Sequence, residues 1–107
     1  MDFKALREEG VEKQPCVYLL SSSRNGTLYL GVTSNLFARV WQHRKHLVAG
    51  FSDHHDATRL VWFEMHQTME SAITREKRLK KWQRAWKVRL IEERNPYWND
   101  LWPEILM

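Results

Sequence analysis

Two short apolar runs on either side of an Asn25-Gly26 pair constrain the fold of this chain more than any other feature. The runs cover residues 16–20 and 27–33 and are rich in leucine, valine and tyrosine. Asn-Gly between two such runs is typical of a β-hairpin closed by a tight type I′ turn. The sequence therefore predicts that the domain is built around an antiparallel pair of strands.

The turn also predicts which side chains share a face of this hairpin. A two-residue Asn-Gly turn would pair Tyr18 with Thr33 and Ser22 with Tyr29. Because side chains alternate along a strand, Tyr18 and Tyr29 would then project from the same face of the sheet. The serines just before the turn could host a bulge that shifts this register.

The rest of the chain predicts one more strand and three helices. In chain order these are a helix from Asn35 to Val48 with Ser34 as N-cap and Gly50 after its end, a strand Leu60–Phe63, a helix from the Thr68 cap to about Trp82, and a helix Arg84–Arg94. The order β-β-α-β-α-α predicts an α+β fold in which a small sheet packs against helices.

Length and composition indicate one folded domain. The 107 residues divide into an N-terminal extension 1–14, a domain 15–102 and a tail 103–107. Apolar residues make up 43% and charged residues 28%, which argues against a disordered chain. The single Cys16 excludes an intramolecular disulfide and a cysteine-based zinc site. No apolar stretch fits a signal peptide or a membrane span, so we expect a cytoplasmic protein without a membrane partner.

The positive charge is concentrated in one segment. Residues 75–94 carry nine basic and three acidic residues, a net charge of +6, within a chain of net charge +4. Such clustering is typical of proteins that bind nucleic acid, although it also fits an ordinary solvated helix surface. The candidate nucleic-acid contacts are Arg75, Lys77, Arg78, Lys80, Lys81, Arg84 and Lys87.

Three further polar residues stand out by their helical positions. Arg39 and His43 are one turn apart and fall on the same edge of a predicted apolar stripe, from which they can reach the sheet. Glu76 lies in the middle of another such stripe. A carboxylate there is costly unless a cation or a metal ion compensates it. Glu76 could therefore bind a metal, or pair with Arg39, Lys80 or a tyrosine hydroxyl.

Taken in order, these residues resemble a known family. One strand carries Cys16-Val17-Tyr18, the next carries Tyr29-Leu30-Gly31, and Arg39, His43 and Glu76 follow on helices. This ordered set resembles the GIY-YIG nucleases. Further stretches look most like the small stand-alone bacterial members, which are similar to the nuclease domain of excision-repair endonucleases. These stretches are residues 29–36, 75–82 and 95–101.

The resemblance implies a three-stranded antiparallel sheet flanked by helices and a DNA endonuclease that uses one divalent ion. Glu76 would hold Mg²⁺ or Mn²⁺, which prefer oxygen ligands. Tyr18 or Tyr29 would act on the attacking water, and which of them does so stays open. Arg39 and His43 would assist that tyrosine or clamp the phosphate. Cleavage would be structure-directed or weakly sequence-specific, and RNA remains an alternative to DNA.

The chain also departs from the family pattern. Cys16 stands where the first motif usually begins with glycine, and Val32 stands where some members have lysine. Many active members carry an asparagine after the glutamate, but Asn95 and Asn99 are the only asparagines near that region. One alternative function is therefore a nucleic-acid-binding module without catalysis. A second is a protein-interaction domain that uses its tryptophan-rich tail.

The six tryptophans are mostly expected in the core. Trp41, Trp62, Trp82 and Trp86 occupy positions that fit the apolar pattern of their elements. Trp98 and Trp102, in the tail, are the candidates for an interface or a base-stacking surface.

Overall fold

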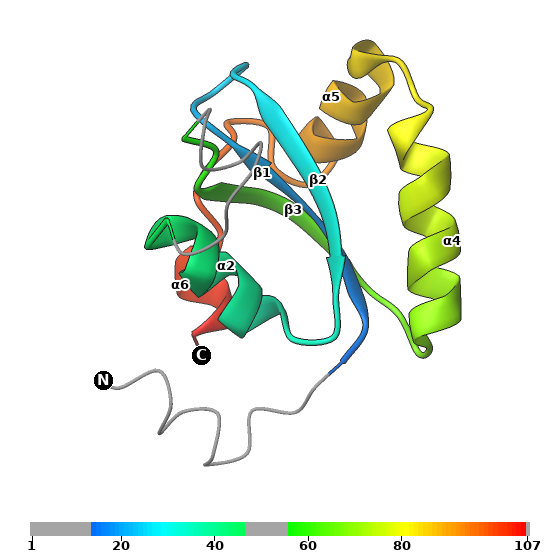
Figure 1. The fold of residues 1–107 in the computed structure, drawn as a ribbon. Coiled ribbons are helices and arrows are strands. Elements are labelled where there is room, and N and C mark those ends of the chain that lie inside the picture. The colour runs from blue at the N-terminus through cyan, green and yellow to red at the C-terminus, as the bar shows by residue number, and fades with distance from the viewer. Residues whose placement is uncertain (1–13, 47–55, 107) are drawn as a thin grey trace.

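The computed structural model describes residues 14–46 and 56–106. It contains the strands β1 (Cys16–Ser21), β2 (Leu28–Thr33) and β3 (Arg59–Met65), and the helices α2 (Leu36–Arg44), α4 (Met69–Lys80), α5 (Arg84–Glu92) and α6 (Trp102–Ile105). The strands form one antiparallel sheet in the order β2-β1-β3, with helices packed around it (Figure 1). The predicted α+β class and the three-stranded antiparallel sheet are confirmed.

The hairpin forms, but its register differs from the predicted one by two residues. Tyr18 pairs with Gly31 and Leu20 pairs with Tyr29. The connection is longer than a two-residue turn, because the amide of Ser22 donates to the carbonyl of Thr27 at 3.1 Å. A shift by two residues preserves the alternation of faces. Tyr18 and Tyr29 therefore still project from the same face, with ring centroids 6.3 Å apart.

Strand β3 pairs with the other side of β1 through a bulge. Leu19 pairs with Trp62 and Leu20 with Leu60, so Val61 is the extra residue of β3. Its carbonyl accepts a hydrogen bond from the side-chain amide of buried Asn95, at 3.1 Å. The asparagine thus satisfies a backbone group that the bulge removes from the ladder.

The outer edge of β3 is covered by the C-terminal segment. The amide of Leu101 donates to the carbonyl of Leu60 at 2.8 Å. In return, the amide of Leu60 donates to the Asp100 carboxylate at 3.3 Å. Asp100 also accepts from Arg44 of α2 at 2.6 Å. The segment then enters α6, which begins at Trp102.

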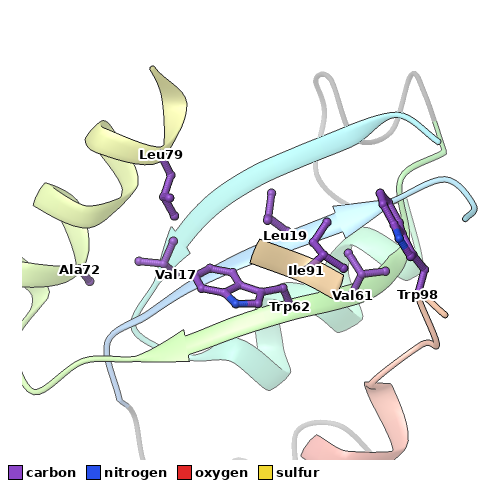
Figure 2. Close-up of a cluster of buried hydrophobic side chains, with 8 residues drawn as sticks. All are labelled: Val17, Leu19, Val61, Trp62, Ala72, Leu79, Ile91 and Trp98. Atoms are coloured by element: carbon purple, nitrogen blue, oxygen red, sulfur yellow. The ribbon is translucent and has the colours of Figure 1, made fainter. Parts of the chain in front are cut away.

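The sheet has a helical layer on each face. On one face α4 and α5 cover a core of apolar side chains, drawn in Figure 2: Val17, Leu19, Val61, Trp62, Ala72, Leu79, Ile91 and Trp98. On the other face α2 and α6 cover the second cluster, which includes Cys16, Tyr18, Leu20, Leu36, Val40 and Leu60. Burial raises the pKa of the Cys16 thiol to about 12, so this side chain is a core residue and not a reactive one.

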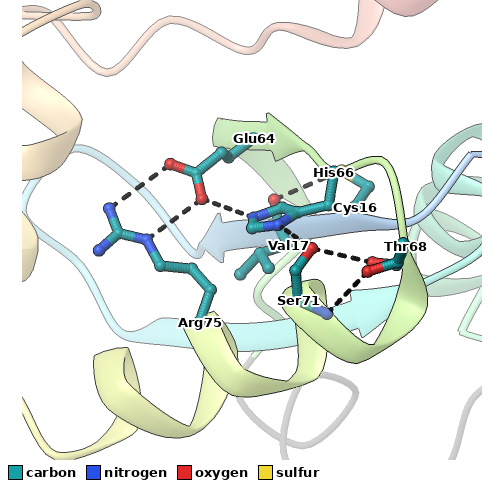
Figure 3. Close-up of polar contacts among 7 residues, drawn as sticks. All are labelled: Cys16, Val17, Glu64, His66, Thr68, Ser71 and Arg75. Carbon is teal, nitrogen blue, oxygen red and sulfur yellow. Dashed lines mark hydrogen bonds and ion pairs between the residues drawn. The ribbon is translucent and has the colours of Figure 1, made fainter.

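Helix α4 is tied to β3 by the polar network in Figure 3. Arg75 donates to the carboxylate of Glu64 at 3.1 Å and 3.4 Å, and His66 Nε2 lies 2.7 Å from the same carboxylate. His66 Nδ1 contacts the hydroxyl of Ser71 at 2.8 Å. Thr68 caps the helix as predicted, accepting from the amide of Ser71. These bonds fix the angle at which α4 leaves the sheet.

Helix α2 is shorter than predicted. Its N-cap is Asn35 and not Ser34, because the Asn35 side chain accepts from the amide of Ala38 at 3.1 Å. The helix ends at Arg44, and His46 turns the chain away with a φ of 57°. The predicted Gly50 terminus lies outside the described residues. Among the described helices, none is long and apolar enough to cross a membrane.

Two tryptophans exchange the places predicted for them. Trp98 is fully buried, and its indole N–H donates to Glu92 at 2.7 Å. The apolar pattern of its helix predicts Trp86 in the core, yet 47% of its surface is exposed. The prediction failed because α5 turns Ile91 and not Trp86 into the core.

Candidate active site

Gly31 sets the position of the first site residue. Tyr18 lies on the central strand directly opposite Gly31. A Cβ atom on Gly31 would lie 2.4 Å from both the Cζ and the hydroxyl of Tyr18. The tyrosine ring therefore lies across the glycine backbone, which only a residue without a side chain permits. The glycine is thus required for packing at this position.

We expect Gly31→Ala to cost about 1–3 kcal/mol of folding free energy, since the added methyl group overpacks the Tyr18 ring. Urea unfolding monitored by circular dichroism measures this cost. In a Tyr18→Leu background, which lacks the ring, most of the cost should disappear. An equal cost in both backgrounds would show that the methyl group clashes with something else.

Four of the predicted site residues come together on the α2 face of the sheet. Tyr18 Oη and His43 Nε2 share a hydrogen bond of 3.1 Å. The rings of Tyr29 and His43 have centroids 5.0 Å apart, and those of Tyr18 and His43 are 6.0 Å apart. Arg39 lies one turn before His43 on α2, and its charge acts on both Tyr18 and His43. The hairpin and α2 thus build one cluster of two phenols, an imidazole and a guanidinium.

Burial determines the protonation of this cluster. Tyr18 is 1% exposed, and burial raises its pKa far above the usual range, with Tyr29 adding to the shift and Arg39 opposing it. His43 is 2% exposed, and burial together with the Arg39 charge lowers its pKa to about 4. At neutral pH, Tyr18 is therefore a protonated phenol and His43 a neutral imidazole.

Solvent access separates the two tyrosines. Tyr18 is enclosed between the sheet and α2, whereas Tyr29 is only partly buried on the edge strand β2. A group that handles a substrate or a water molecule must be reachable from outside. The sequence alone leaves open which tyrosine acts on the attacking water. Solvent access therefore provides a structural criterion for choosing between Tyr18 and Tyr29.

Glu76 is buried in the apolar face of α4, as its position in the pattern predicts. It is 8% exposed and lies between Ala72 and Leu79, which both pack into the core. Its Oε2 accepts from the ammonium of Lys80 at 2.9 Å, which is one of the pairings that the sequence predicts as alternatives to a metal. The Lys80 side chain is 58% exposed, and such surface pairs are weak.

Glu76 approaches from a different element than the cluster of tyrosines. Helix α4 packs on the other face of the sheet and runs beside strand β2 (Figure 1). Among the buried polar residues of the described part, Glu76 is the only carboxylate. The described residues contain no group of three or more metal-ligating side chains.

Three of the predicted nucleic-acid contacts also have a role within the fold. Arg75 binds Glu64 and lies over the ring of Trp82, at 5.5 Å from its centroid. Lys80 pairs with Glu76. Arg84 donates to the carbonyls of Asn25 and Gly26 at 2.9 Å and 2.7 Å, and so holds the hairpin turn against α5. Of the other four, Lys77, Arg78 and Lys81 are exposed and Lys87 is half-buried.

Of the two asparagines near the expected position, Asn95 has its side chain engaged within the fold. The Asn95 amide donates to the carbonyls of Val61 and Asn99, and its oxygen accepts from the amide of Asn99. Asn95 therefore fixes the turn after α5 and the bulge of β3. Its position after the helix and before Pro96 is the sequence signal for this structural role.

The sequence of this chain is similar to those of known proteins. The family model of the GIY-YIG catalytic domain matches residues 14–89. The UPF0213 protein of Staphylococcus aureus strain Mu3 is 36% identical over 78 residues, which cover 73% of this chain and 94% of that protein. The UPF0213 proteins SAV0488 of strain Mu50 and SA0446 of strain N315 match equally well. No solved structure matches. The strands and helices that carry the tyrosine cluster and Glu76 all lie inside the matched region, and the chain belongs to the GIY-YIG family.

Proposed function

We propose that this protein is a metal-dependent endonuclease that hydrolyses phosphodiester bonds of DNA. The observation that carries the proposal is the cluster of Tyr18, Tyr29, Arg39 and His43 on one face of the sheet. A partly buried cluster that contains a guanidinium fits a site for an anionic phosphate. Family membership supports the nuclease class, and the substrate and the metal are the finer parts of the proposal.

Tyr29 is the residue proposed to contact the attacking water. It is partly exposed, whereas Tyr18 is enclosed and strongly favours its protonated form. Tyr18 acts as a positioning residue that holds His43 through their hydrogen bond. Arg39, one turn from His43, clamps the scissile phosphate. A neutral His43 leaves Arg39 as the cation of the cluster, which concentrates the positive charge at one point.

Glu76 is proposed to hold one Mg²⁺ or Mn²⁺ ion. A single carboxylate with several waters is the usual protein contribution to a magnesium site that also binds phosphate oxygens. When bound, such an ion neutralises charge on the phosphate and on the leaving oxygen. The ion pair with Lys80 supports a cation site at this carboxylate, and the Lys80 side chain that a metal ion would displace is 58% exposed.

The surface of α4 and α5 is proposed to contact the phosphate backbone. The exposure of Lys77, Arg78 and Lys81 and the half-buried position of Lys87 support such contacts. Arg75, Lys80 and Arg84 add positive charge nearby, although each also has a partner within the fold. Phosphate contacts position a nucleic acid without reading its sequence. We therefore propose that cleavage is structure-directed or weakly sequence-specific. We also propose that the protein acts in the cytoplasm.

A panel of labelled DNA tests the proposal. Single-stranded, duplex, flapped, forked and branched forms, with an RNA counterpart, are incubated with Mg²⁺, with Mn²⁺ and with chelator. We expect cleavage only with a divalent ion, and the preferred form would indicate repair, recombination or defence as the context. Binding that weakens with salt, without cleavage under any condition, would contradict the nuclease assignment.

That second result would favour a binding module of the same fold. Two observations support this alternative: Glu76 pairs with Lys80, and Asn95 has a structural role. Self-association without salt-sensitive nucleic-acid binding would instead favour an interaction domain.

Tyr29→Phe should lower the cleavage rate by about 10²–10⁴-fold, the range typical of a lost general acid–base group. Tyr18→Phe should cost about 1 kcal/mol of folding free energy, from the lost hydrogen bond to His43, and should lower the rate less. Single-turnover cleavage and urea unfolding measure the two effects. A folded Tyr18→Phe variant that is slower than Tyr29→Phe would reverse the assigned roles.

A further inference from the structure

The corner between α4 and α5 forms an open aromatic cavity outside the tyrosine cluster. Trp82 lies just after α4, and Trp86 lies in the first turns of α5. Their rings meet edge to face, with centroids 6.0 Å apart and an interplanar angle of 82°. Together with Arg89, Leu90 and Glu93 they line a cavity of about 390 Å³. This volume falls within the range of about 300–1,000 Å³ that is usual for ligand sites.

The two tryptophans have different surroundings. Trp82 is partly buried against the core, and the Arg75 guanidinium covers its ring at 5.5 Å from the centroid. Arg75 is in turn fixed by Glu64 (Figure 3). Trp82 is therefore a rigid wall. Trp86 packs on this wall by its edge and is 47% exposed, so the cavity contains a large flat apolar surface that the fold does not use.

The polar groups around the cavity favour a nucleic acid as its occupant. Arg89 and Glu93 line it, and Lys81 lies next to Trp82 in the chain. An arginine suits a phosphate, and a carboxylate can accept from the amino group of a base. A second hollow of about 430 Å³ on α5 shares Arg89 and Glu93. The two hollows thus adjoin each other on α5.

We propose that this cavity binds an unpaired base of a nucleic acid, with the base stacked on the indole of Trp86 and Arg89 holding its phosphate. The proposal rests on the proposed function and extends it, because it assigns a contact that unpaired bases make and the internal base pairs of a duplex do not. In a duplex the faces of the bases are already stacked on one another. The aromatic surface would therefore direct the nuclease to forked, flapped or single-stranded DNA.

The test compares binding of labelled single-stranded oligothymidine with binding of a blunt duplex, by fluorescence anisotropy in the presence of chelator at one fixed salt concentration. Trp86→Ala should weaken single-strand binding by roughly 5- to 150-fold, the usual effect of one lost stacking contact, and leave duplex binding unchanged. Tyr97→Ala is the matched control, because Tyr97 is an aromatic residue that is 67% exposed outside the cavity. It should change neither affinity.

Two further variants keep the result interpretable. Trp86→Phe retains an aromatic face and should retain most of the single-strand affinity. Trp86→Leu retains apolar volume without a π face, should bind like Trp86→Ala, and replaces it if the alanine variant does not fold.

The remaining outcomes overturn the inference. Equal losses on single strand and duplex would make Trp86 a general contact, and an unchanged single-strand affinity would remove it from the interface. In either case, metal-dependent cleavage by the parent would leave the proposed function standing. A parent protein that binds no nucleic acid would overturn both proposals.

Discussion

Replacing Glu76 with glutamine should abolish metal-dependent cleavage, with a rate loss of at least about 10³-fold, while the protein stays folded. Glutamine has the same shape and fits the buried position between Ala72 and Leu79, but it cannot neutralise a divalent ion. Glu76→Ala should have the same effect on cleavage. The lost pair with Lys80 costs little, because the Lys80 side chain is 58% exposed and i,i+4 pairs on helices contribute about 0.3–0.5 kcal/mol.

The matched control is Glu70→Gln, the same substitution at an exposed position of α4. It should cleave like the parent. Lys80→Met tests the competition between Lys80 and the metal ion, because it removes the ammonium that pairs with the Glu76 carboxylate. We expect it to lower the Mg²⁺ concentration needed for half-maximal cleavage. If Glu76→Gln cleaves as fast as the parent, the metal does not bind at this carboxylate.

The free energy of unfolding should fall by roughly 3 kcal/mol between pH 7 and pH 4 because of His43 alone. The folded protein holds the His43 pKa at about 4, whereas an unfolded histidine has a pKa of 6.5. Between pH 6.5 and pH 4, His43 therefore binds a proton in the unfolded chain but stays neutral in the folded chain. The stabilisation is complete above pH 6.5 and is lost as the pH falls through 4.

Urea unfolding at a series of pH values measures this loss. His43→Gln should be less stable than the parent at pH 7, where the Tyr18 contact is disturbed, but its stability should change less between pH 7 and pH 4. His46→Asn is the control, because His46 is an exposed histidine in a left-handed conformation that asparagine tolerates. It should keep the parent's pH dependence. An identical acid slope in His43→Gln would assign the loss to other groups.

The hairpin shows which part of a fold can be predicted from local sequence. The alternation of Tyr18 and Tyr29 is a property of any strand and survives a shift of two residues. The register itself depends on the hydrogen bonds of the turn. Arg84, far away in the chain, donates to the carbonyls of Asn25 and Gly26 in that turn. The serines before the turn allow a shifted register, but local patterns do not contain the Arg84 partner and so do not choose between the two registers.

The same division applies to the helices. The burial of Glu76 follows from helical periodicity, which is a local property. The choice of Lys80 as its partner, among several candidates, depends on which neighbours the folded helix leaves within reach. Trp86 is exposed because the α4–α5 corner turns Ile91 inward, and Trp98 fills the core from the tail. Both depend on tertiary packing, which overrides the pattern of a single helix.

The backbone contacts between the C-terminal segment and β3 bear on the tendency of the protein to aggregate. An open strand edge is a template on which a second copy can add its own strand. At Leu60 the outward amide and carbonyl are already bound, to Asp100 and Leu101. The side chain of Arg59 also donates to the carbonyl of Trp98 at 3.0 Å. The segment from Trp98 to Leu101 therefore covers the outer edge of β3. By occupying these backbone groups, it disfavours the addition of a strand from a second copy of the protein.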